Sequence, residues 1–245
     1  MRISRFFYKG DLKENSIIIL DALLAQRINH VLRLKKDDMI ILFNGLGGEY
    51  RCKILSVQKS KIEVMVQSWQ DTFTESSLEI HLGLGISRAE KMDYAVQKSI
   101  ECGVQKITPL FTEFGGVHLE GDRLEKRLHH WQAIAVSATE QCERVRVPEI
   151  LTPTPILNWI KNNHCDLNLI CDTKNKQTLI KDCSLQKNQK KISLLIGSEG
   201  GFSEKEKSFA EKNNFISIFL GPRILRTETA PVVALTLLQS HFGDL

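Results

Sequence analysis

The sequences LLIGSEGG, at residues 194–201, and LGPRILRTETA, at residues 220–230, decide the fold of this 245-residue chain. Each combines an apolar run with a turn that holds glycine, a charged residue and hydroxyl groups, and a helical pattern follows each turn. Glycine has no Cβ, so its backbone can take a positive φ and approach a ligand closely. In an open α/β sheet, ligands settle beyond the carboxyl ends of the strands. The two segments therefore predict one small-molecule site, with ordinary turns as the alternative.

The spacing of the glycines does not fit the familiar phosphate-binding loops. The chain has no Walker sequence, and the glycines after Ile196 are not spaced G-x-G-x-x-G. Glu199 and Glu228 would also repel a pyrophosphate. An acidic residue beside a glycine turn better suits a ligand with hydroxyl groups or positive charge, and S-adenosylmethionine (SAM) is one such ligand.

Strand and helix patterns alternate from residue 78 onward, which predicts a largely parallel sheet in an α/β domain. Ser87 with Glu90 and Ser203 with Glu206 read as capping boxes that open two of the helices. Gly103 is expected to end the first of these helices. The predicted strands are 80–86, 107–111, 167–171, 192–196 and 215–220. The predicted helices are 87–102, 122–142, one that begins at 203, and 228–241.

Residues 1–72 read as a small β-barrel with one helix. The helix is predicted over 21–34, with Leu24, Ile28, Val31 and Leu32 as its buried stripe. Small barrels of this kind often bind RNA. The predicted strands are 16–20, 39–43, 49–57 and 62–66, and the polar stretch 69–77 is expected to be a linker.

The excess of positive charge lies in this first part of the chain. The whole chain has 33 Lys and Arg against 29 Asp and Glu, and residues 1–72 hold 12 of the basic and 8 of the acidic residues. Lys and Arg contacts to phosphate give RNA affinity that does not depend on sequence, so Arg2, Arg5 and Arg33 are candidate RNA-binding residues. A modest surface charge that keeps the protein in solution is the alternative.

Composition narrows the class of protein further. Hydrophobic residues make up 42% and charged residues 25%, as in globular domains. No apolar run approaches a membrane span or a secretory signal, so we expect a cytoplasmic protein. The six cysteines form no C-x-x-C pair, and we expect neither a metal site nor a disulfide.

Three polar clusters are candidates for chemistry. Arg226 and Glu228 follow the last strand, where an arginine could stabilise negative charge in a transition state. A helix cap at Thr227 or Thr229, and for Glu228 a first-turn acid matched to the helix dipole, are the alternative interpretations. The clusters at 87–91 and 139–146 offer further candidates for RNA contact, which are Arg88, Lys91 and Arg144.

With these segments in hand, the chain resembles the bacterial 16S ribosomal RNA (uracil-N3)-methyltransferase family, within the SPOUT class of knotted methyltransferases. The matching stretches run in order over nearly the whole length, with LGPRILRTETA as the strongest. The others are FFYKG near the start, HVLRL at 30–34, SRAEKMDYAVQKSIECGVQKITPLF at 87–111, ATEQCERVRVPEI at 138–150 and LLIGSEGGFSEKE at 194–206.

The resemblance implies an N-terminal PUA-like RNA-binding barrel over 1–72 and a SPOUT methyltransferase domain over 73–245 that carries a trefoil knot. It also implies a homodimer, SAM in the knot, and methylation of one uridine in the decoding region of 16S rRNA in the small subunit. The cofactor is expected to lie among Ile196, Gly197, Glu199, Gly200, Gly201, Leu220, Gly221, Leu225, Arg226, Thr227 and Ala230.

Methylation of uracil at N3 requires an unpaired or flipped base and removal of the N3 proton. We expect a carboxylate, Glu228 or Glu140, to take that proton while Arg226 stabilises the charge that develops on a uracil oxygen. Two rivals stay open: the same fold acting on a ribose 2′-hydroxyl or a transfer RNA base, and an RNA-binding assembly protein whose pocket is vestigial.

Overall fold

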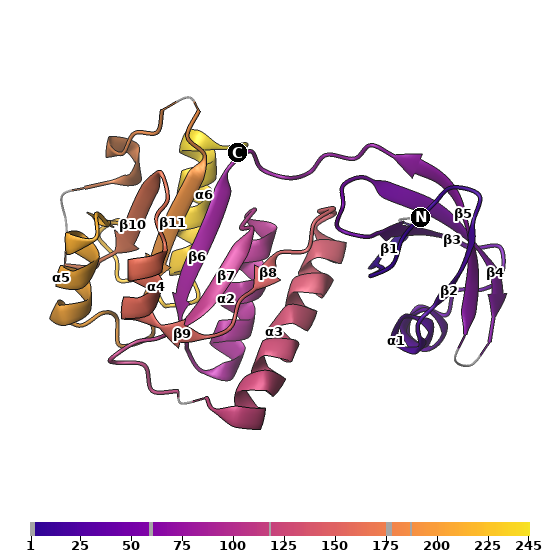
Figure 1. The fold of residues 1–245 in the computed structure, drawn as a ribbon, viewed down its shortest axis with the longest axis horizontal. Helices are drawn as coiled ribbons and strands as arrows, with labels where there is room; N and C mark the ends of the chain where they lie inside the picture. Colours follow the sequence, from indigo (N-terminus) through magenta and orange to yellow (C-terminus); the bar gives the residue numbers. More distant parts are fainter. Residues whose placement is uncertain (1–2, 59–60, 118, 175–177, 187) are drawn as a thin grey trace. The chain divides into compact units, whose positions relative to one another are not determined.

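The computed structural model describes residues 3–58, 61–117, 119–174, 178–186 and 188–245. The chain forms two compact units, which are drawn in Figure 1. Unit 1 consists of Met1–Glu75 together with Thr139–Val147, and unit 2 of Ser76–Ala138 together with Pro148–Leu245. A short segment from the middle of the sequence therefore belongs with the N-terminal unit.

Unit 1 is built on a five-stranded sheet in the order β1-β3-β4-β5-β2. All its pairs are antiparallel except β1 with β3. The side chains of Phe6, Ile40, Ile54 and Val64 fill its core. Its strands are β1 (Ser4–Phe7), β2 (Ile17–Leu20), β3 (Met39–Phe43), β4 (Glu49–Val57) and β5 (Ile62–Gln70).

The helical segment of unit 1 differs from the prediction in its second half. It begins as α1 (Ala22–Gln26), capped by the Asp21 carboxylate, and continues as a π-helix, η1 (Arg27–Val31). Leu24 and Ile28 are buried as expected, but Val31 is 72% and Leu32 43% exposed, so that part of the predicted stripe is wrong. The wider π turn rotates the later positions away from the core.

Two strand predictions in unit 1 also need correction. Strand β5 runs on to Gln70, so Trp69 pairs with Tyr50 and does not lie in a linker. Strand β1 was not expected, because its sequence SRFF contains two charged or polar residues before the aromatic pair. Its parallel pairing with β3 supplies the hydrogen bonds that the short segment could not find locally.

Unit 2 contains the predicted parallel sheet, in the order β12-β10-β11-β6-β7-β8, with β9 paired to β7. Every pair in this sheet is parallel. The strands are β6 (Glu79–Gly85), β7 (Lys106–Phe111), β8 (Glu149–Ile150), β9 (Thr154–Pro155), β10 (Leu167–Cys171), β11 (Lys191–Ile196) and β12 (Ile216–Ile218).

Helices cover both faces of this sheet (Figure 1). Helices α4 and α5 pack together over Leu110, Ile170 and Leu195, while α2 packs against α6. The helices are α2 (Ala89–Glu101), α3 (Gly121–Gln141), α4 (Ile156–Asn162), α5 (Glu204–Lys212) and α6 (Ala230–Phe242), with a short 3₁₀ turn η2 (Ile180–Asp182).

The two predicted capping boxes have different outcomes. Ser203 and Glu206 form the expected reciprocal box at the start of α5. The predicted capping box at Ser87 is wrong. The N-cap residue of α2 is Arg88, which makes no side-chain cap hydrogen bond, and Ser87 is buried. Gly103 ends α2 as expected, with a φ of +86°.

The cysteines are all free thiols. Burial raises the pKa of the Cys52 thiol to about 12 and raises the pKa of Cys171 as well, so these groups stay protonated at neutral pH. No helix in the described ranges is both long and apolar enough to cross a membrane.

Candidate functional site

The site lies in unit 2, where the carboxyl ends of its parallel strands meet. Strands β6, β7, β11 and β12 end at Gly85, Phe111, Ile196 and Ile218. Because the strands are parallel, the loops that follow them emerge at one edge of the sheet. The segment 197–203, here called the GSEGG loop, and the segment 219–229, here called the RTE loop, are two of these.

A hydrogen bond joins the two loops. The Thr227 hydroxyl donates to the carbonyl oxygen of Gly197 at 2.8 Å, and Thr227 is 8% exposed. The two residues are thirty positions apart in the sequence, so this contact brings the predicted halves of the site together. The alternative of a helix cap falls on Thr229, which is the N-cap residue of α6 but makes no side-chain cap hydrogen bond, so Thr227 is not that cap.

The GSEGG loop is a tight turn. The Gly201 amide donates to the Ser198 carbonyl at 2.9 Å, and Gly201 has a φ of +69°. The Ser198 hydroxyl lies 3.1 Å from that of Thr112, which follows β7. A Cβ on Gly85 would collide with the backbone of Ser198, so the end of β6 must be glycine for the turn to sit there.

Glu199 connects the GSEGG loop to the start of α2. Its carboxylate accepts from the Arg88 amide at 3.3 Å and from the Lys91 ammonium at 3.4 Å. Partial burial alone would raise the pKa of Glu199, but its own backbone amide, the Arg88 amide and Lys91 together bring that pKa below its ordinary value. Glu199 is therefore an anion at neutral pH that could hold a cation or a hydroxyl group.

Arg226 and Glu228 stand at the end of the RTE loop. The nearest approach of the guanidinium to the carboxylate is 3.9 Å, and the Arg226 side chain is 79% exposed. The Glu228 side chain is only 17% exposed. Its Oε2 atom is buried and has no hydrogen-bond partner in the described part of the chain. A buried carboxylate oxygen without a partner is costly, and a ligand with a donor group would relieve the cost.

The remaining predicted cofactor residues supply an apolar and glycine-rich lining. Ile196 is 2% exposed, and Gly221 has a φ of +109°, which favours glycine. Leu220, Leu225 and Ala230 are half-buried. Apolar side chains, glycine backbone and the Glu199 carboxylate suit a ligand that joins a purine, a ribose and a positive centre.

Glu140, the other candidate base, lies in unit 1 and has structural partners. Its carboxylate accepts from the Phe7 amide at 3.0 Å and from both terminal nitrogens of Arg27, at 3.2 and 2.6 Å. The residue is 7% exposed. Within unit 1, therefore, both oxygens of Glu140 have hydrogen-bond partners, whereas the GSEGG and RTE loops belong to unit 2.

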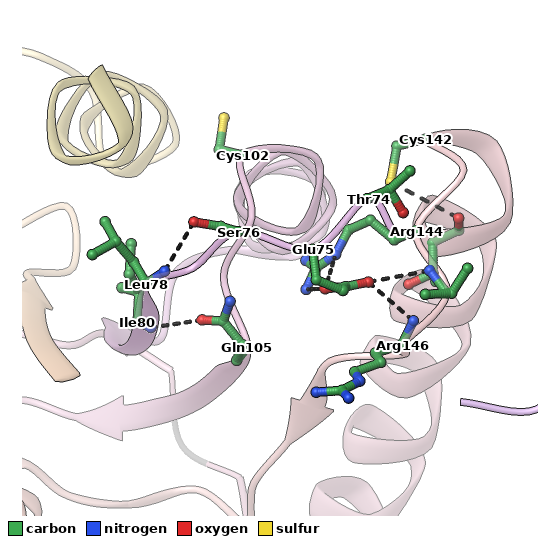
Figure 2. Close-up of polar contacts among 12 residues, drawn as sticks. Thr74, Glu75, Ser76, Leu78, Ile80, Cys102, Gln105, Cys142, Arg144 and Arg146 are labelled. Carbon is green, nitrogen blue, oxygen red and sulfur yellow. Dashed lines mark hydrogen bonds and ion pairs between the residues drawn. The ribbon is translucent and has the colours of Figure 1, made fainter. Parts of the chain in front are cut away.

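Arg5 and Arg144 are likewise buried in unit 1. Arg5 pairs with Glu49 at 2.8 Å, and Arg144 pairs with Glu75 at 2.6 Å. Figure 2 shows the Glu75 carboxylate between Arg144 and the backbone of the following residues, where it also accepts from the Arg146 amide at 3.0 Å. Since Arg5 is 8% and Arg144 4% exposed, the structure gives these side chains no open surface for RNA.

Arg33 does lie on an open surface. With Lys35 and Lys36 it lines a hollow of about 630 Å³ in unit 1. The neighbouring carboxylates are engaged elsewhere, because Asp37 pairs with Lys53 at 2.8 Å and Asp38 accepts from the Lys35 amide at 2.7 Å. Arg88 and Lys91 flank Glu199 in unit 2, while Arg2 lies outside the described residues.

Sequence reasoning missed two residues that shape the site. Thr112 links the loop after β7 to Ser198 in the GSEGG loop, and Gly85 makes room for the turn. The two isolated glycines within the strand sequence EIHLGLG could have pointed to Gly85, since glycine inside a strand often marks a close backbone approach. Nothing in the local sequence distinguishes Thr112.

Comparison with known proteins finds family models that match parts of both units. Residues 74–239 match a family model described as an RNA methyltransferase domain, and residues 28–66 match one described as an RNA methyltransferase PUA domain. The predicted α/β fold with a PUA-like N-terminal domain is thereby confirmed.

Relatives and solved structures resemble the chain over its full length. A protein of Buchnera aphidicola subsp. Schizaphis graminum named ribosomal RNA small subunit methyltransferase E is 41% identical and covers 100% of this chain and 98% of its own length. The protein of the same name from Rickettsia conorii is 32% identical, with 100% of both chains covered.

Two solved structures contain SAM. A Legionella pneumophila protein in complex with SAM superposes with a TM-score of 0.96 at 35% identity over 100% of both chains. A ribosomal RNA small subunit methyltransferase E from Neisseria gonorrhoeae bound to SAM has a TM-score of 0.92 at 32% identity, again over 100% of both chains.

Proposed function

This chain belongs to the ribosomal RNA small subunit methyltransferase E family, and we propose that it transfers a methyl group from SAM to N3 of one uridine in the decoding region of 16S rRNA. The observation that carries the proposal is the bond from Thr227 to Gly197, since it makes one site from the GSEGG and RTE loops. The enzyme is a SAM-dependent rRNA methyltransferase, and the position of methylation is the inferred part.

The residues that would hold SAM are those of the two loops. Glu199 suits its hydroxyl and cationic groups, and Gly201 and Gly221 let the backbone approach. When bound, SAM supplies a methyl group on a sulfonium that is already activated for transfer. The protein has then to orient the uracil base toward the methyl group and accept the proton from uracil N3.

Glu228 is the candidate general base. As the N3–C bond forms, the S–CH3 bond of SAM would break and S-adenosylhomocysteine would leave with its electron pair. The N3 proton would pass to the Glu228 carboxylate, and Arg226 would stabilise the negative charge on the adjacent uracil oxygen. The exposure of Arg226 leaves its guanidinium within reach of an incoming base. Glu140 is the weaker candidate, because its two oxygens are already used by Phe7 and Arg27.

Both units would bind RNA. The hollow lined by Arg33, Lys35 and Lys36 offers three cations to phosphate, and Arg88 and Lys91 stand next to the cofactor loops. We assign the main RNA-binding role to the barrel, residues 1–72, and methyl transfer to residues 73–245. We also propose a homodimer, a trefoil knot formed by the last strands and the last helix, and action in the cytoplasm on the small ribosomal subunit, with no metal required.

The test is to incubate the protein with small ribosomal subunits that lack the modification and with SAM carrying a labelled methyl group. Digestion to nucleosides and mass analysis should find the label on N3-methyluridine from a single position of 16S rRNA. Label on a ribose 2′-hydroxyl, or in transfer RNA, would support the rival enzyme instead. SAM binding without any labelled RNA, or no SAM binding at all, would contradict the proposal and favour an assembly protein.

A further inference from the structure

Phe114 is an exposed aromatic residue beside the GSEGG loop that the mechanism above does not use. It follows β7 in a turn closed by the Gly115 amide, which donates to the Thr112 carbonyl at 3.0 Å. Its side chain is among the large apolar ones left open to solvent, and the residue is 53% exposed. A single exposed apolar residue is ordinary, so its meaning depends on how it is held and on what lies next to it.

The backbone of Phe114 is fixed against the GSEGG loop. A Cβ placed on Gly200 would lie 2.6 Å from the Phe114 Cβ and 3.0 Å from its carbonyl oxygen, so the two backbones pack with no room for a side chain between them. On one side, Thr112 meets the Ser198 hydroxyl at 3.1 Å. On the other, the Glu113 amide donates to Glu206 at 2.8 Å. An aromatic ring on this support is exposed but not loosely attached.

The position of Phe114 beside the GSEGG loop favours a nucleic acid over an apolar protein surface. Glu199, next to Gly200, accepts from the Arg88 backbone amide and pairs with the Lys91 ammonium at 3.4 Å, so one cation borders the same loop. An unpaired base offers a flat apolar face and carries a phosphate on each side, which matches an aromatic ring with a cation nearby.

We propose that the Phe114 ring is a stacking platform for an unpaired base of the RNA, either the target uracil or its neighbour. The inference rests on the proposed function, because it assumes that RNA enters at this edge of the sheet. Stacking compensates for the base contacts that are lost when the nucleotide leaves the RNA helix. Phe114 is then a positioning residue for the substrate and is separate from the groups that hold SAM.

The test uses Phe114→Ala, Phe114→Leu and Phe114→Trp in the full-length protein. We measure KM and kcat on unmethylated small subunits, the Kd for single-stranded RNA by filter binding, and SAM affinity by calorimetry. Loss of one stacked base costs roughly tenfold in affinity, so Ala and Leu should raise KM and the RNA Kd by about that factor. Trp should restore both, and SAM affinity should stay within about twofold throughout.

Three results would overturn the inference. Wild-type behaviour of Phe114→Leu would mean that the side chain makes only an apolar contact. Weaker SAM binding in Phe114→Ala would mean that Phe114 supports the GSEGG loop. A changed oligomeric state on sedimentation would mean that a second copy of the chain covers the ring. Failure of the proposed function is seen separately, as absence of methylation by the wild-type protein, and the RNA Kd still tests the stacking in that case.

Discussion

Glu228 and Glu140 carry the same carboxyl group in different surroundings, and the difference decides their roles. Both carboxylate oxygens of Glu140 accept hydrogen bonds inside unit 1, from the Arg27 guanidinium and from a backbone amide. Glu228 keeps one buried oxygen without a partner among the described residues. A general base must have an oxygen available for the substrate proton, so the sequence alone left two candidates and the hydrogen bonds favour one.

Replacing Glu228 with Gln should lower kcat by about 10²- to 10⁴-fold, because an amide cannot take the N3 proton. Binding of SAM, measured by calorimetry, should change much less. Glu204→Gln is the matched control, since Glu204 is an exposed carboxylate on α5 that pairs with Lys174. A Glu228→Gln enzyme that turns over as fast as this control would remove Glu228 from the mechanism.

His81 is a second residue whose surroundings fix its chemistry, here for stability. Its Nε2 atom lies 3.3 Å from the Trp159 indole nitrogen and 2.7 Å from the Thr108 hydroxyl, so Nε2 is the acceptor. Nδ1 then carries the hydrogen and donates to the Asn163 amide oxygen at 3.2 Å. Burial lowers the pKa of His81 to about 4.

This lowered pKa predicts acid sensitivity of unit 2. The unfolded chain binds a proton at His81 below about pH 6.5, whereas the folded chain does so only below about pH 4. Its contribution to stability is therefore complete above pH 6.5 and is lost as the pH falls toward 4, by about 3 kcal/mol. We expect denaturant titrations across this pH range to show a smaller fall in the free energy of unfolding for His81→Gln than for the wild type. Substitution of the exposed His164 by Gln should leave that fall unchanged. Parallel curves for wild type and His81→Gln would contradict this.

At the scale of elements, the sequence predicts most of the parallel sheet because its buried strands are mainly apolar runs, such as KISLLI of β11. Short elements escape prediction. Strands β8 and β9 have two residues each, and α4 begins at a proline-flanked position without a capping side chain. Their formation depends on pairing with β7 and on packing over the sheet, which no local pattern records.

The same contrast holds for the site. Glycine spacing and charge predicted the GSEGG and RTE loops, and Thr227 joins them as expected for one site. The roles of Thr112 and Gly85 depend on which strands become neighbours, so only the folded sheet reveals them. Arg5 and Arg144 were predicted to bind RNA because the sequence does not show that each forms a buried ion pair with a carboxylate.

The joint between the two loops can be tested directly. Thr227→Val keeps the shape of the side chain but leaves the Gly197 carbonyl without its donor, at a cost of about 1 kcal/mol. SAM affinity should therefore fall by roughly fivefold on calorimetry, while Thr227→Ser should retain it. Equal affinity of wild type and the Val variant would show that the loops are held together by other contacts.

At the scale of the whole molecule, binding of RNA and binding of SAM should be separable, because the basic hollow belongs to unit 1 and the cofactor loops to unit 2. Replacing Arg33, Lys35 and Lys36 with Ala should weaken RNA binding. A plot of the logarithm of the RNA association constant against the logarithm of the salt concentration should become less steep, by about 2 in slope. SAM affinity should be unchanged. An equal charge change at the exposed residues Lys190, Lys205 and Lys212 is the control, and an equal loss of slope in that variant would mean that only net charge matters.

The central claim is that the GSEGG and RTE loops together form the site of the methyl donor. The most direct measurement is a crystal structure of the protein grown with SAM. The account predicts electron density for SAM in contact with residues 197–201 and 220–227, with Glu228 within reach of the transferred methyl group. SAM bound elsewhere, or the two loops closed on each other by protein side chains in every copy, would contradict it.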